Sequence, residues 1–157
     1  MMFGKYQNTL KWWALFCAQL LFLGAAWYFG ILQFIWLSDI TTLTLWILGL
    51  HYIYSIWFGF KINQLDRNKL FNYERDNKRS EFFIETQSDL GLLGTIFGFI
   101  IILQLGFSGL EVGNTSSMQA ALTVMSQGLG TALLTTAVAL TSKILLIIQH
   151  NILQKTL

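Results

Sequence analysis

Among the threonines in the strongly apolar stretches of the second half of this sequence, four stand where a hydroxyl group could have a specific use. Thr95 lies in one stretch, and Thr131, Thr135 and Thr136 lie in the next. Where water is excluded, a threonine oxygen can ligate a cation or hold an ordered water molecule along a confined path. The sequence therefore predicts that two apolar helices line a polar pore for ions, to which these four threonines contribute hydroxyl groups.

Small residues accompany the threonines at helical spacing. Lipid gives helices little hydrophobic reason to associate, so close contact depends on small side chains and on hydrogen bonds across the gap. Three glycines share one helical stripe with Thr95, and residues spaced by three and four form a stripe that includes Thr135. Plain packing would also explain such stripes, and the paired threonines favour the functional interpretation. We predict that the helices pack through Gly91, Gly94, Gly98, Gly128, Ala132, Ala139 and Ser142.

The composition of the chain places these stretches in a membrane. Hydrophobic residues make up 54% of the 157 residues, charged residues make up 11%, and proline is absent. Soluble domains average far more charge than this. Four windows are long enough to cross a bilayer as helices, at residues 12–37, 40–60, 90–107 and 122–148. We predict an all-α integral membrane protein with four transmembrane helices, in which residues 1–157 form a single domain.

Basic residues are distributed unevenly among the connecting segments. Lysine or arginine precedes the first window, follows the fourth, and is frequent between the second and third. The two other connections carry only the charged residues Asp39 and Glu111. The positive-inside rule then predicts that both ends of the chain are cytoplasmic. Residues 61–89 are predicted to form a cytoplasmic helical hairpin with its turn near Asn77 to Ser80.

Groups that would indicate an enzyme are missing from the sequence. It contains no phosphate-binding loop, no His-Glu-x-x-His and no Gly-x-Ser-x-Gly, and no extramembrane segment is long enough to bury a core. Cys17 is the single cysteine, and His51 and His150 are isolated, so we expect no metal site. We predict that the protein is not an enzyme and binds neither a cofactor nor nucleic acid. The windows at 90–107 and 122–148 hold no carboxylate, so an acid for ion transfer must come from a partner.

Two motifs occur in order in the second half of the chain. They are Gly91-Leu-Leu-Gly-Thr-Ile-Phe-Gly-Phe-Ile100 and Gly128-Leu-Gly-Thr-Ala-Leu-Leu-Thr-Thr-Ala-Val-Ala-Leu140. Together they resemble the MotA/TolQ/ExbB proton channel family. The resemblance places Thr95 and Thr136 at the family's pore threonines. Thr135 beside Thr136 is similar to the Thr-Thr pair of sodium-type flagellar stators, and Thr131 stands where TolQ and ExbB carry a glutamate.

The resemblance implies an assembly and a function. Five copies would form a homopentamer in the inner membrane of a bacterium, or as a phage-encoded protein in that membrane, with the helices at 90–107 and 122–148 lining a central pore. The pore would surround two copies of a single-span partner of the MotB/TolR/ExbD kind, which carries a membrane aspartate. The chain would be the pore-forming subunit of an ion-driven motor that converts the flow of protons, or of sodium ions, into rotation or force. We expect protons.

The short segment between the second and third windows departs from part of the family. Flagellar stators carry a large cytoplasmic domain there, so the resemblance is to a minimal four-span member whose load and partner the sequence does not identify. The alternative function is a small structural scaffold or a holin-like membrane protein that uses the small stripes only for packing. A neighbouring gene for a single-span protein with a membrane aspartate would favour the motor, and a neighbouring lytic enzyme would favour the holin.

Overall fold

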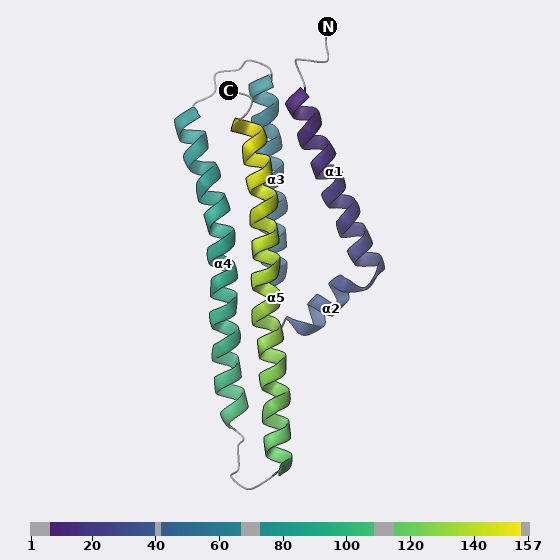
Figure 1. Cartoon of the computed structure of the whole chain (residues 1–157), viewed down its shortest axis with the longest axis vertical. Helices are drawn as coiled ribbons and strands as arrows, with labels where there is room; N and C mark the ends of the chain where they lie inside the picture. Colours follow the sequence, from purple (N-terminus) through teal and green to yellow (C-terminus); the bar gives the residue numbers. More distant parts are fainter. Residues whose placement is uncertain (1–6, 40–41, 67–72, 109–114, 155–157) are drawn as a thin grey trace.

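The computed structural model describes residues 7–39, 42–66, 73–108 and 115–154, and within them all regular structure is helical (Figure 1). Four of the helices are long and apolar enough to cross a membrane. The prediction of an all-α protein with four transmembrane helices is therefore confirmed for the described residues. The helices are α1 (Gln7–Tyr28), α2 (Ile31–Ser38), α3 (Leu43–Asp66), α4 (Tyr73–Ser108) and α5 (Thr115–Gln154).

The first apolar stretch is two helices and not one. Gly30 has φ 73° and ψ 11°, a left-handed conformation that ends α1 and precedes α2. The chain turns there through hydrogen bonds from the amides of Phe29 and Gly30 to the carbonyls of Ala25 and Trp27. Glycine adopts this conformation without the penalty that a β-carbon imposes. As a result α2 leaves the direction of α1 and crosses toward the start of α3 (Figure 1).

The charged segment before the third apolar window is part of a single long helix. α4 has 36 residues and includes positions 77–80, so the turn predicted there is wrong. Its buried positions Asp76, Ser80, Ile84 and Gln87 continue the same stripe as Gly91, at spacings of three and four. A stripe at that spacing stays on one helix face, so charged residues on the other faces do not interrupt the helix.

α4 and α5 run antiparallel side by side over most of their lengths, and α3 packs beside the C-terminal half of α5 (Figure 1). α1 packs against α3. The indole of Trp12 occupies the space that a β-carbon at Gly59 would fill, so this glycine permits the close approach of α1. The aromatic ring of Phe16 stacks on Trp12. An apolar cluster joins the four long helices near the start of α1 and the end of α5. It contains Trp12, Phe58, Ile62, Ile84, Leu146 and Leu153.

Aspartate carboxylates accept hydrogen bonds in the first turns of α1 and α3. The Oδ2 atom of Asp66, at the end of α3, accepts hydrogen bonds from the backbone amide and the hydroxyl of Thr9 in the first turn of α1, at 2.9 and 2.6 Å. Asp39 accepts a bond of 2.7 Å from the amide of Thr44 in the first turn of α3. A carboxylate that accepts from first-turn amides stabilises a helix start.

Candidate functional site

The small residues of α4 and α5 face each other within one chain. Space that β-carbons would need at Gly91, Gly94 and Gly98 is taken by α5. A β-carbon at Gly94 would lie 2.7 Å from the hydroxyl oxygen of Thr135, and one at Gly98 would lie 2.7 Å from the β-carbon of Ala132. The absence of these side chains therefore lets the two helices approach closely enough for hydroxyl groups to bond across the interface.

Thr95 of α4 and Thr136 of α5 form a hydrogen-bonded pair across this interface. The Thr95 hydroxyl lies 3.1 Å from the carbonyl oxygen of Gly91 and 3.5 Å from that of Ala132. The Thr136 hydroxyl lies 3.0 Å from the carbonyl oxygen of Ala132 and 3.4 Å from that of Gly91. Both side chains are partly exposed on the surface of the chain. Four oxygen atoms thus meet at the edge of the α4/α5 interface.

This oxygen cluster has more acceptors than donors. Each hydroxyl carries one hydrogen and two lone pairs, and each carbonyl oxygen carries two lone pairs. The carbonyl oxygens also accept from backbone amides of their own helices, and that of Ala132 accepts from Thr135, so the lone pairs that remain available are those of the two partly exposed threonines. A hydronium ion, a water molecule or a sodium ion binds to oxygen groups of this kind.

The other predicted pore residues lie in different surroundings. Thr135 is fully buried between α4 and α5, and its hydroxyl donates to the carbonyl of Ala132 at 3.0 Å. The side chain of Thr131 lies outside the described part of the structure. The structure therefore brings together Thr95 and Thr136 and places Thr135 inside the helix interface of one chain.

The remaining residues predicted to pack also lie in interhelical contacts. Ala139 fills the space at Gly91, and the side chain of Ile102 occupies the space at Gly128. Ser142 is buried on α5, one helical turn from Ala139. Gly106 lies near Met125, a contact that the sequence analysis did not anticipate.

Sequence reasoning also missed a set of buried polar side chains, which we call the polar seam: Gln19, His51, Ser55, Gln87 and Gln149. Each has at most 8% of its surface exposed. The imidazole Nε2 of His51 lies 3.4 Å from Oε1 of Gln19, and Gln149 donates to the hydroxyl of Ser55 at 2.7 Å. His51 and Ser55 are four residues apart on α3, which was the available signal, but their partners come from other helices.

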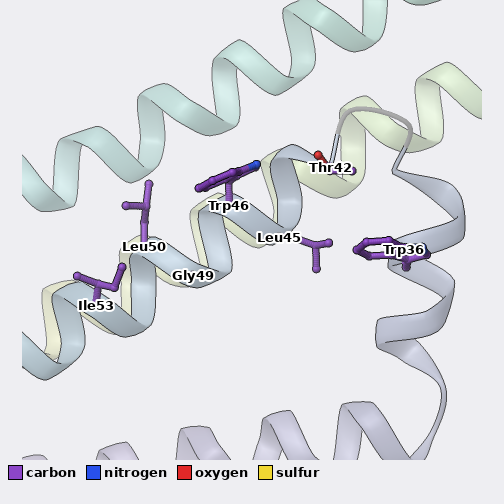
Figure 2. Close-up of a pocket in the computed structure, with 7 residues that line it drawn as sticks. All are labelled: Trp36, Thr42, Leu45, Trp46, Gly49, Leu50 and Ile53. Atoms are coloured by element: carbon purple, nitrogen blue, oxygen red, sulfur yellow. The ribbon is translucent and has the colours of Figure 1, made fainter.

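The described surface also has an apolar hollow of about 440 Å³ between α2 and α3 (Figure 2), and neither member of the threonine pair lines it. Trp36 of α2 and Leu45 of α3 face each other across it. No charged side chain lines the hollow, so it offers nothing that would hold an ion. The lining residues are Trp36, Thr42, Leu45, Trp46, Gly49, Leu50 and Ile53.

Replacement of Gly98 tests whether the α4/α5 contact controls stability. In Gly98→Ala the new methyl group would meet Ala132, including its Cα at 3.1 Å and its amide nitrogen at 3.2 Å, and backbone atoms cannot rotate away. We expect a loss of about 1–3 kcal/mol of unfolding free energy, measured by denaturant titration in detergent micelles. Gly24→Ala on α1, where nothing lies within 4 Å, is the control and should retain full stability. Equal stabilities of the two variants would contradict the close α4/α5 contact.

Comparison with known proteins identifies the second half of the chain. A profile of the MotA/TolQ/ExbB proton channel family matches residues 67–157, which is more than half of the sequence and includes α4 and α5. Searches among curated proteins and among solved structures found no match. The matched region contains both motifs and both members of the threonine pair.

Proposed function

The chain belongs to the MotA/TolQ/ExbB proton channel family, and from this membership we propose that it is the pore-forming subunit of an ion-driven membrane motor. In this proposal α4 and α5 line a central pore in a homopentamer. The pore surrounds two transmembrane helices of a MotB/TolR/ExbD-like partner, and ion flow through it is converted to rotation or force.

The observation that carries the proposal is the Thr95–Thr136 pair. The two hydroxyls come from separate helices and meet at a partly exposed edge of the chain, in otherwise apolar surroundings. Threonines buried purely for packing need no exposed oxygen surface, as Thr135 illustrates in the same interface. We assign Thr95 and Thr136 to the ion path and give Thr135 the role of packing against Gly94. Thr131 stays a proposed pore residue on the motif alone.

Exposed apolar surface supports an oligomer. The ends of α4 and α5 near Ser108 and Thr115 extend beyond α1 and α3, so the other helices of the chain leave them uncovered (Figure 1). Large apolar side chains are exposed there and further along both helices, and lipid or neighbouring subunits must cover them. Examples are Leu103, Phe107, Met118, Leu122, Leu129 and Leu133.

The acid that the ion needs must come from the partner. After Asp89 the sequence has only one carboxylate, Glu111, in the connection between α4 and α5. A proton would bind the partner's membrane aspartate, pass the threonine pair and leave on the cytoplasmic side. Neutralisation removes a buried charge from the partner and changes its affinity for the threonine oxygens, so the partner helices would step to the next subunit. One charge that crosses 100 mV supplies about 2.3 kcal/mol, several times the thermal energy.

We place both chain ends and the charged part of α4 in the cytoplasm, as the distribution of lysine and arginine indicates. The membrane is then the bacterial inner membrane. The exposed charged residues of this part of α4 are the available surface for a load, and include Arg75, Lys78, Arg79, Glu81 and Glu85.

A packing scaffold remains the second candidate, because one observation favours it. Atoms of α5 in the same chain occupy the space beside the α4 glycines. Packing within a single subunit is therefore enough to explain the stripes of small residues. The partly exposed threonine pair distinguishes the two functions, since a scaffold has no need of a hydroxyl pair at the surface of the chain.

The subunit count tests the proposal directly. We expect native mass spectrometry of the protein in gentle detergent or nanodiscs to show five copies, with a single-span chain bound when the operon is expressed together. The same count on Gly98→Ala shows whether the α4/α5 contact is needed for assembly. A monomer, a dimer or a heterogeneous ring would remove the central pore and leave the scaffold.

A further inference from the structure

The polar seam crosses the interior of the subunit between α1, α3, α4 and α5. Gln87 of α4 donates to the carbonyl of Ile47 at 3.5 Å, and Ile47 lies one helical turn before His51. Gln149 of α5 bonds to Ser55, one turn after His51. Side chains from α1, α4 and α5 therefore converge on roughly 12 Å of α3, the length of the eight helical steps from Ile47 to Ser55. The seam begins one turn from Gly91, whose carbonyl accepts from the threonine pair.

Several atoms of the seam lack hydrogen-bond partners among the described residues. They are Nε2 of Gln19, Nδ1 of His51, Oε1 of Gln87 and Oε1 of Gln149, and each is shielded from solvent. Gln87 and Gln149 have no exposed surface at all. Buried polar atoms are nearly always paired, because an unpaired one has lost its bonds to water without compensation.

The unpaired atoms include both a donor and acceptors. In the orientation found, Oε1 of Gln19 faces Nε2 of His51, so the imidazole carries its proton on Nε2 and Nδ1 is an acceptor. Rotation of the amide would reverse both roles and leave Nδ1 a donor, still unpaired. A charged imidazole is disfavoured because the seam contains no acidic side chain. A water molecule can donate two hydrogen bonds and accept two, so it can serve a donor and acceptors at the same time.

We propose that each subunit holds an internal water site centred on His51, bounded by Gln19, Gln87, Ser55 and Gln149. A bound water molecule at this position donates one hydrogen to Nδ1 of His51 and the other to a glutamine oxygen, and it accepts from the amide of Gln19. The site lies between the helices of one chain and is separate from the partly exposed threonine pair. It requires neither a partner nor a central pore.

An alternative arrangement would pair the His51 imidazole without a water molecule. The backbone of Ser142 approaches the imidazole of His51, although Nδ1 does not reach hydrogen-bond geometry with it. A small shift would let Nδ1–H donate to that carbonyl oxygen while Gln19 donates to Nε2. This arrangement satisfies the ring without water and puts the imidazole proton on the opposite nitrogen.

Solid-state NMR of the oligomer in lipid bilayers separates the two arrangements. The chain has two histidines, so [15N]histidine labelling of the His150→Gln variant leaves one imidazole, that of His51. We expect magnetisation from water to reach this imidazole, with the ring proton on Nε2 and an unprotonated Nδ1. Absence of transfer from water, with the proton on Nδ1, would overturn the proposal.

Variants of one neighbour sharpen the result. Gln87→Leu removes a wall of the site and should lower the water signal of His51 several-fold. Gln104→Leu changes an exposed glutamine on the same helix and should leave the signal unchanged. Equal signals in the two variants would overturn the assignment of Gln87 to the site. A threonine variant that loses ion flux should keep the water signal of His51. The water site and the pore are therefore tested independently of each other.

Discussion

Thr136→Val is expected to abolish ion flux while leaving the oligomer intact. Valine keeps the shape of threonine and removes the hydroxyl, so the oxygen cluster loses the group that Thr136 contributes to Thr95 and Ala132. Close contact of α4 with α5 at the glycines does not involve this hydroxyl, so we expect the packing to survive its loss. Flux is measured as proton uptake into liposomes that contain the protein and its co-purified partner, with a pH-sensitive dye and an imposed membrane potential.

Two controls define the result. Thr141→Val removes an exposed hydroxyl of the same helix, which bonds only within its own turn to the carbonyl of Ala137, and should retain full flux. Thr136→Ser restores an oxygen and should restore most of the flux. Full flux in Thr136→Val, in a protein that still assembles, would rule out the assignment of this residue to the ion path.

Lys61→Met is expected to cost the most stability of any single variant considered, about 3–5 kcal/mol. Lys61 of α3 forms an ion pair of 3.0 Å with Asp76 of α4, and only 2% of the Asp76 side chain is exposed. The lysine nitrogen also lies 5.7 Å from the centre of the Trp57 ring. Methionine keeps the apolar stem but leaves the carboxylate buried without its cation. Chemical unfolding followed by circular dichroism in detergent measures the loss.

The double variant Lys61→Met with Asp76→Leu should recover most of the lost stability, because no buried charge remains. Arg79→Met changes an exposed arginine on the same helix as Asp76 and should shift stability by no more than about 0.5 kcal/mol. If the single and double variants lost equal stability, the stabilisation would come from the lysine stem or the aspartate packing and not from the ion pair.

The variants Thr136→Val and Lys61→Met test contacts at two different places along α4. The ion pair joins α3 to the charged start of α4, and the threonine pair joins the apolar half of α4 to α5. Polar contacts near the start of α4 and at Thr95 limit the rotation of this helix relative to its neighbours. The proposed ion path therefore depends on a helix that is held at two points along its length.

Local patterns in the sequence were sufficient to predict the transmembrane helices. The apolar windows predicted four transmembrane helices, because a run of about twenty apolar residues has few other stable arrangements in a bilayer. The motifs around Gly91 and Gly128 indicated the family, which the profile match confirms. The predicted turn at residues 77–80 failed because charged residues suggested an interruption, whereas the buried spacing of Asp76 and Ser80 continued the helix.

By itself the sequence determined the membrane helices, the family and the set of threonines that share two apolar segments, since each of these depends on residues close together in the chain. Only the tertiary structure decided that Thr136 meets Thr95 while its neighbour Thr135 is buried against Gly94. Adjacent residues on a helix point about 100° apart, so their roles depend on how α5 is rotated against α4. That rotation is set by contacts between helices distant in the sequence, which also bring Gln19 to His51, Gln87 to Ile47 and Gln149 to Ser55.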